Sequence, residues 1–278
     1  MSTPPGPFFK NAPVVERVLG IQFDPIPGFH IGLLGAFWQC LGDDWTHVTD
    51  APPIEPQFER FGENAVFAFP FPGAVSIRLS QAPACRLQIL NQAKDRMIQV
   101  QNGRFHLNWK GASGPDYPRY HELRREFRDY LGRFQAFLAT KVEANLRPNQ
   151  WEVTYLNHVP KGPVWQAPAD WHSLFPPLHV LPPVVVTASL ETMGGQWQYE
   201  IRPQRGRLHV ELRHGRQEHP TPTEVLVFNL TARGPIESVD ESGILAGIDL
   251  GHETIVHAFK ECTSSSAHIH WELQDETT

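Results

Sequence analysis

The stretch RFHLNWKGASGPDYPRYHELRREFRDYLGRFQAFL, residues 104–138, decides the fold that we predict for this chain. At its start, apolar Phe105, Leu107 and Trp109 alternate with polar residues, and this period of two indicates a strand with one buried face. The next residues, KGASGPD, contain two glycines and a proline and predict a loop. The remainder repeats its apolar residues with helical spacing.

That remainder predicts a long amphipathic helix that begins near Asp116 or Tyr117, with Asp116 as its cap. Pro118 suits the first turn, where a missing N–H removes no hydrogen bond. Steps of three and four residues place the apolar side chains on one face: Tyr120, Leu123, Phe127, Tyr130, Leu131, Phe134 and Leu138. Gly132 predicts close packing at its position. A helix that reaches about Val142 is long enough to lie across a sheet.

The sequence on either side predicts antiparallel strands. Asn102-Gly103 separates MIQVQ from RFHLNW, which indicates either a tight hairpin or a bulge in one long strand. In the first half, a short helix is expected at 31–41 and further strands at 14–23, 65–71 and 86–91. In the second half, we expect a helix at 244–259, turns at Gly194-Gly195 and Arg205-Gly206, and strands at 151–157, 184–191, 197–202, 207–213 and 225–230.

Both halves of the chain run from strands to a long helix, which predicts an α+β fold with antiparallel sheets, each covered by a long helix. The expected units are residues 13–145 and 150–272, with loose termini at 1–12 and 273–278. Two similar halves are one interpretation of this layout. Unrelated halves are the other, since no residue-level repeat is visible.

The composition narrows the functional classes. Apolar residues make up 41% of the chain and charged residues 19%, as in ordinary globular proteins. The net charge of -6 disfavours nucleic acid as a partner. Three dispersed cysteines form no CxxC pair, and neither a signal peptide nor an apolar run of membrane-spanning length is visible. We therefore expect a cytoplasmic protein without a membrane segment, and with no glycine-rich phosphate loop we expect no cofactor.

Polar and aromatic residues are expected to gather where the central strand, the KGASGPD loop and the 151–157 strand meet. Their side chains could contact a ligand or a partner, or they could satisfy nearby backbone groups. These residues are Asn108, Trp109, Tyr117, Tyr120, Arg124, Tyr155 and Asn157.

Two further groups are weaker candidates. A basic hairpin contains Arg202, Arg205, Arg207, Arg213 and Arg216, which form either a patch for an acidic partner or ordinary solvated charge. A metal site is an alternative for His252, His257, His268 and His270. Their spacing is poor for one ion, because His252 and His257 are five residues apart, whereas ligands on one helix face are separated by four.

Several of these motifs carry a resemblance to a known family. The NW of Asn108-Trp109, the YP-Y of Tyr117–Tyr120 and the TY-N of Thr154–Asn157 are similar to the signature of an uncharacterised, sporadically distributed bacterial family. The segments PVVERVLGIQF, PPIEPQ and GHETIVHAFKECTSSSAHIHW also resemble it. The resemblance implies a stand-alone protein, hints at a mobile-element or defence setting, and carries over no catalytic residue.

Together these observations favour a binding protein without enzymatic activity. The abundant Trp and Phe could line a groove between sheet and helix, which would hold a protein partner, a second copy in a homodimer, or an apolar small ligand. A metal-assisted hydrolase that uses the four C-terminal histidines is the first alternative. A protein that neutralises a toxin or an effector is the second.

Overall fold

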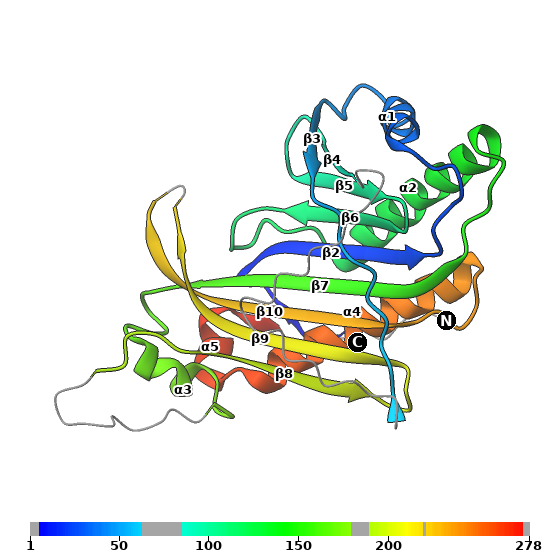
Figure 1. Cartoon of the computed structure of the whole chain (residues 1–278). Coiled ribbons are helices and arrows are strands. Elements are labelled where there is room, and N and C mark those ends of the chain that lie inside the picture. Colours follow the sequence, from blue (N-terminus) through cyan, green and yellow to red (C-terminus); the bar gives the residue numbers. More distant parts are fainter. Residues whose placement is uncertain (1–5, 63–84, 179–188, 219–220, 275–278) are drawn as a thin grey trace.

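One nine-stranded antiparallel sheet carries the two long helices of this protein on one of its faces (Figure 1). The computed structural model describes residues 6–62, 85–178, 189–218 and 221–274. The sheet contains β2 (Val14–Phe23), β3 (His47–Ala51), β4 (Arg86–Leu90), β5 (Arg96–Gln101), β6 (Arg104–Lys110), β7 (Pro148–Pro160), β8 (Gly194–Ile201), β9 (Gly206–Gln217) and β10 (Thr223–Pro235). Their order is β3-β4-β5-β6-β2-β7-β10-β9-β8.

The helices are α1 (Ile31–Gln39), α2 (Tyr120–Lys141), α3 (Trp171–Leu174), α4 (Glu241–Cys262) and α5 (Ser265–His270), with a 3₁₀ turn at Pro168–Asp170. Helix α2 packs on β6 and β2, while α4 packs on β7, β10 and β2. A separate two-stranded sheet joins β1 (Phe8–Phe9) to β11 (Leu273–Gln274) and so holds the N-terminal segment beside the C-terminal helices. In the described part of the chain, none of the helices is long and apolar enough to span a membrane.

These elements confirm the predicted α+β class with antiparallel pairing, but not the separate sheets. Strands β2 and β7 come from different halves of the chain and pair with each other from Val14 opposite Asn157 to Phe23 opposite Pro148. The two halves therefore share one continuous sheet, and both long helices lie on the same face of it. In each half the first strand lies innermost and the last strand lies next to it. The interpretation of the two halves as repeats of one unit stays a prediction.

The turn between β5 and β6 decides between the two interpretations of Asn102-Gly103. Gln101 pairs directly with Arg104, so Asn102 and Gly103 form the two-residue turn of a tight hairpin. Gly103 has a φ of 105°, which a residue with a side chain rarely adopts. The Asn102 amide also accepts a hydrogen bond from the Ile26 N–H and donates one to the Ile26 carbonyl, which fixes the neighbouring loop.

Helix α2 begins later than predicted, at Tyr120, and Asp116 does not cap it. The preceding residues serve tertiary contacts instead: the Tyr117 hydroxyl donates to the Phe9 carbonyl, and the Pro118 carbonyl accepts from Arg17. The predicted apolar face is otherwise correct, with Leu123, Phe127, Leu131, Phe134 and Leu138 buried and with Phe137 added to them. Close packing at Gly132 is wrong, because a Cβ there would meet no atom within 4 Å.

Two other predictions are corrected. Gly194-Gly195 is no turn, since β8 begins at Gly194 and pairs with β9 from that residue onward. The strand predicted at 65–71 and most of that predicted at 184–191 lie outside the described residues, and the described remainder, 189–191, is not a strand.

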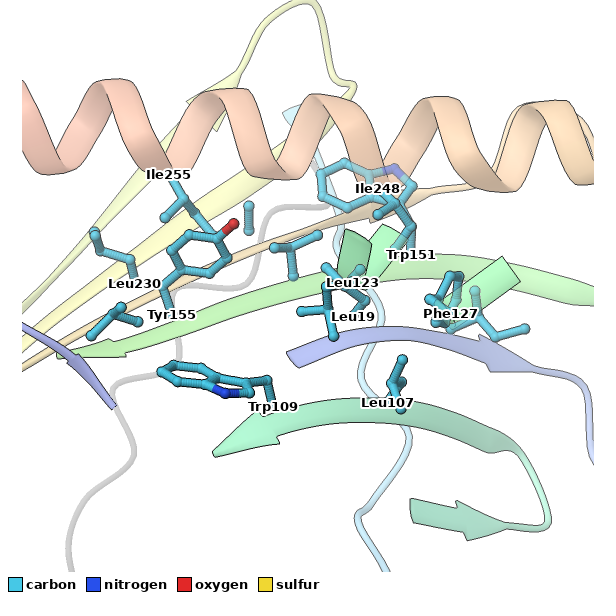
Figure 2. Close-up of a cluster of buried hydrophobic side chains, with 14 of the residues drawn as sticks. Leu19, Leu107, Trp109, Leu123, Phe127, Trp151, Tyr155, Leu230, Ile248 and Ile255 are labelled. Carbon is cyan, nitrogen blue, oxygen red and sulfur yellow. The ribbon is translucent and has the colours of Figure 1, made fainter. Parts of the chain in front are cut away.

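The core between sheet and helices is built around bulky side chains of the central strands (Figure 2). Trp151 on β7 is 1% exposed and packs beneath α4. The helix approaches it closely because Gly247 and Gly251 face the indole: a Cβ on Gly251 would lie 2.8 Å from Trp151 Cζ3, and one on Gly247 would overlap Cδ1. Two glycines one turn apart therefore set the distance between α4 and the sheet.

Alanine substitutions at two helical glycines should have opposite effects. Gly247→Ala should lower the free energy of unfolding by roughly 1–3 kcal/mol, because the added methyl group overpacks Trp151. Gly132→Ala in α2 should raise it by up to about 1 kcal/mol, since the site is open and alanine has the higher helix propensity. Urea unfolding of both variants measures the difference, and an equal effect at the two positions would contradict this account of the helix packing.

Candidate functional site

A pocket of about 550 Å³ opens beside the first turn of α2 and the middle of α4. The N-terminal segment closes one side of it, because β1 is held by β11 and because Phe9 packs edge-on against Phe259 of α4 with ring centroids 5.1 Å apart. The floor comes from β2 and β7. The lining residues include Phe8, Val14, Arg17, Tyr117, Arg119, Tyr120, Arg124, Tyr155, Asn157, Asp249, His252, Glu253 and Val256.

Arg17 is a buried cation on the floor of this pocket. It pairs in the sheet with Tyr155 and shares the helix-facing side of β2 with Leu19, so its side chain enters the apolar layer. The guanidinium lies over the Tyr117 and Tyr155 rings, 4.4 and 4.6 Å from their centroids, and Nη1 donates to the Pro118 carbonyl at 2.9 Å. The residue is 7% exposed, and its Nε has no hydrogen-bond partner. Among the described residues, no carboxylate lies within ion-pair distance of it.

Another of the three arginines in the described lining of the pocket, Arg124, is neutralised within the protein. Its Nε and Nη2 donate to the two carboxylate oxygens of Asp249 at 2.6 and 2.9 Å, and the Tyr120 hydroxyl donates to Oδ1 at 2.5 Å. Burial and the neighbouring Asp249 carboxylate raise the pKa of Tyr120, so this phenol stays protonated. The cluster joins α2 to α4 and leaves no net charge at this part of the wall.

His252 completes the polar part of the pocket. Its ring stacks on Tyr120 with centroids 3.7 Å apart, and Nδ1 shares a hydrogen bond of 2.7 Å with the Tyr155 hydroxyl. Burial, followed by the charge of Arg17, lowers the pKa of His252 from 6.5 to about 3. The imidazole is therefore neutral near pH 7, and it adds no second cation beside Arg17.

The pocket brings together five of the seven residues predicted to contact a ligand: Tyr117, Tyr120, Arg124, Tyr155 and Asn157. Within this group Asn157 also satisfies the backbone, because its amide donates to the Phe228 carbonyl at 3.1 Å. Two predicted residues lie elsewhere. Asn108 is on the opposite face of the sheet, where it contacts Glu16 and Gln99, and Trp109 is buried behind Tyr117.

Sequence reasoning missed Arg17 and Asp249. A usable signal existed for Arg17, since a period of two places it on the same side of VVERVLGIQF as Leu19 and Ile21, where a charge is unusual. No comparable signal existed for Asp249, because its role arises from the contact between two helices that are far apart in the sequence.

The four histidines of the metal alternative are not brought together. His252 faces the pocket, whereas His268 contacts the Thr263 hydroxyl at 2.9 Å and the Lys260 carbonyl at 3.1 Å. His257 and His270 are exposed. Within residues 6–62, 85–178, 189–218 and 221–274, no group of three or more His, Cys, Asp or Glu side chains is placed to bind a metal ion. The set of ligands that this alternative needs is therefore not formed by these histidines.

The predicted basic patch is also dispersed. Arg207 binds Glu59, while Arg205 lies 3.7 Å from Glu237 and Arg216 lies 3.2 Å from Glu218. Arg213 lies 3.9 Å from Glu211, and Arg202 is exposed at the turn before β9. Because a strand rises about 3.3 Å per residue, the arginines at the two ends of β9 are roughly 30 Å apart. The described contacts are therefore local ion pairs along a strand.

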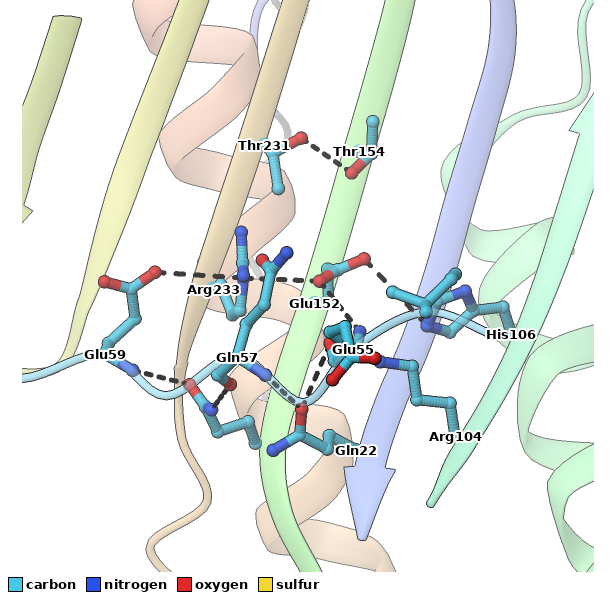
Figure 3. A network of polar contacts seen from close by, with 12 residues as sticks. Gln22, Glu55, Gln57, Glu59, Arg104, His106, Glu152, Thr154, Thr231 and Arg233 are labelled. Atoms are coloured by element: carbon cyan, nitrogen blue, oxygen red, sulfur yellow. Dashed lines mark hydrogen bonds and ion pairs between the residues drawn. The ribbon is translucent and has the colours of Figure 1, made fainter. Parts of the chain in front are cut away.

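A polar network covers the face of the sheet opposite the helices (Figure 3). Residues 52–61 cross this face without forming a strand, and side chains of the sheet bind their backbone. Gln101 accepts from the N–H of Ile54 and donates to its carbonyl, both at 2.8 Å. Gln22 accepts from the Gln57 N–H at 2.9 Å. The crossing segment is thus attached mainly through its own backbone.

Charged side chains form the centre of this network. Glu152 lies 3.2 Å from Arg233, 3.4 Å from Arg104 and 3.9 Å from His106, and the absence of a side chain at Gly20 leaves room for the His106 ring. Burial lowers the pKa of His106 from 6.5 to about 4, an effect that the charge of Glu152 only partly offsets. Glu59 of the crossing segment binds His209 at 2.7 Å and Arg207. These mutual contacts give the network a structural role.

Comparisons of the chain with protein-family models, with curated proteins and with solved structures give no match. The resemblance to a sporadically distributed bacterial family therefore stays a prediction. The same holds for the mobile-element or defence setting that it implies.

The two buried histidines should make the protein less stable in mild acid. The pKa values of His106 and His252 are lowered to about 4 and about 3, so below pH 6.5 the unfolded chain binds protons that the folded chain excludes. The free energy of unfolding should therefore decrease as the pH is lowered, and His106 should contribute about 2 kcal/mol to the decrease between about pH 7 and pH 5. Urea unfolding measures this loss of unfolding free energy between the two pH values. In the His106→Gln variant the loss should be smaller by that amount.

Thr154→Val is the control, because it removes a hydrogen bond to Thr231 from the same face of the sheet but no titratable group, so it should leave the pH dependence unchanged. A His106→Gln variant with the full pH dependence of the unsubstituted protein would show that His106 is not the proton-excluding group.

Proposed function

We propose that this chain is a binding protein whose pocket takes a small ligand with an anionic group and an apolar body. The observation that carries the proposal is Arg17, a buried guanidinium that faces the pocket with no carboxylate beside it among the described residues. Buried charges in proteins are generally paired, because removing an ion from water costs several kcal/mol. The two tyrosine rings and one carbonyl offset only part of this cost.

An anionic ligand would supply the missing partner. A carboxylate or a similar group can accept two parallel hydrogen bonds from a guanidinium, and such charge-assisted bonds are stronger than neutral ones. Arg124 does not compete for the ligand's charge, since Asp249 already binds it in this way. Neutral His252 and the Tyr155 hydroxyl lie beside Arg17 and can hydrogen-bond to a polar substituent.

The rest of the pocket suits an apolar body. Phe8, Phe9, Val14, Val256 and Phe259 contribute to its lining, and its volume lies in the range of about 300–1,000 Å³ that is usual for small-molecule sites. Glu253 also lines the pocket, so a ligand with an additional hydroxyl or amino group has a partner there. The lining formed by the described residues contains no Ser, Thr or Cys, so it lacks the nucleophile of a serine-, threonine- or cysteine-dependent hydrolase.

Paired probes can test the proposal. The anionic dye 8-anilinonaphthalene-1-sulfonate and the uncharged N-phenyl-1-naphthylamine share an aromatic body and differ in the sulfonate. We expect Arg17→Met to weaken binding of the anionic dye about 10- to 100-fold, the loss of one charge-assisted contact, and to change binding of the neutral dye little. Arg17→Lys should retain an intermediate affinity, because it keeps the charge but loses the fork of donors.

Arg133→Met is the matched control. Arg133 also lies over a tyrosine ring, that of Tyr130, and donates to a backbone carbonyl, that of Leu41, but it does not line the pocket. In fluorescence titrations, the Arg133→Met variant should bind both dyes with the same affinity as the unsubstituted protein. An Arg17→Met protein that binds both dyes normally would overturn the proposal, and native mass spectrometry of the purified protein then shows whether any small molecule is retained.

A further inference from the structure

Strand β8 forms one end of the sheet and has unusual features for an edge. Among the described residues it pairs on one side only, with β9. Its eight residues, GGQWQYEI, contain no lysine and no proline, and Glu200 is the one charged side chain. The opposite edge, β3, is shorter and carries His47 and Asp50. Edge strands are normally protected by short length, charge, proline or a covering segment, because their free backbone groups pair readily with other strands.

Two large aromatic side chains make this edge more distinctive. Trp197 is 36% exposed and Tyr199 is 52% exposed. In the register with β9 they lie opposite Val210 and Leu208, which are buried, so both rings project from the helix-bearing face. The main contacts of helix α4 with the sheet are with β7, β10 and β2. The two rings therefore leave part of their apolar surface in water.

The sequence of β8 is complementary to itself. Residues 196–200, QWQYE, have the order polar, aromatic, polar, aromatic, polar in both directions, with Gln198 at the centre. We propose that a second copy of the chain pairs with β8 in antiparallel fashion around Gln198. Trp197 then lies opposite Tyr199 of the partner subunit, and this aromatic pair occurs twice. Glu200 lies opposite Gln196 of the partner subunit, so no like charges meet.

This arrangement follows from the symmetry of an antiparallel pair. A twofold axis through Gln198, perpendicular to the sheet, makes the two patches identical, as a closed dimer requires. The axis keeps each face of the sheet on its own side, so the helices of both copies lie on one face and flank the four aromatic rings. Directly opposed aromatic residues are favourable cross-strand neighbours. The new backbone hydrogen bonds use groups that β9 leaves free.

The proposed interface is separate from the pocket. No residue of β8 or β9 lines that pocket, whose walls come from the N-terminal segment, β2, α2, β7 and α4. The dimer can therefore be tested without changing ligand binding, and the failure of one proposal leaves the other unaffected.

Charge exchange at the central residue gives a specific test. Gln198 is exposed and faces its own copy across the axis, so Gln198→Lys places two positive charges opposite each other, and Gln198→Glu places two negative ones. Sedimentation velocity over a concentration series should find the unsubstituted protein dimeric. Each variant alone should dimerise at least tenfold more weakly, and an equimolar mixture of the two should recover the dimer as a heterodimer.

Thr49→Lys, an exposed substitution on the opposite edge strand β3, is the control and should leave the dimer intact. Circular dichroism and the thermal midpoint establish that both Gln198 variants are folded. The proposal is overturned if the unsubstituted protein is monomeric, if both variants remain dimeric, or if the mixture of folded variants stays monomeric.

Discussion

The pairing of β2 with β7 is the interaction on which the rest of this structure depends. It joins the first strand of one half of the chain to the first strand of the other, and it makes a single sheet from strands that are about 130 residues apart in the sequence. Helix α2 packs on β6 and β2, and α4 packs on β7, β10 and β2, so the two helices meet above this central pair. The contact between α2 and α4, and with it the Arg124–Asp249 pair, is a direct result.

The same pairing sorts the side chains of the central strands into two chemically different layers. On the helix side, Leu19, Ile21, Trp151 and Val153 are fully or almost fully buried, and glycines in α4 bring the helix close to Trp151. On the other side, Glu152 meets Arg104, His106 and Arg233, and the backbone of residues 52–61 is bound by glutamine side chains. Buried charge is stabilised there because Glu152 lies beside both Arg104 and Arg233, and Glu59 binds both Arg207 and His209.

Arg17 is the exception to this sorting. It has the position of an apolar residue on the helix side of β2, but it brings a charge into that layer. The guanidinium makes cation-π contacts with the rings of Tyr117 and Tyr155. The pocket lies beside it, at the point where the charge interrupts the apolar layer. A residue that breaks a local rule without full compensation within the protein is where function is most reasonably sought.

Local patterns in the sequence determined most of the element types, the apolar face of α2 and the gathering of five polar and aromatic residues near one loop. They left a hairpin and a bulge as alternatives at Asn102-Gly103. These follow from periodicity and turn chemistry, which act over a few residues. Only the tertiary structure decided that the strands form one sheet. It also decided that Tyr117 and Pro118 lie outside the helix, where they contact Phe9 and Arg17. It further decided that Arg124 has a carboxylate partner, Asp249, whereas Arg17 has no carboxylate partner among the described residues. These results depend on contacts between residues far apart in the chain, and their free energies are absent from any local pattern.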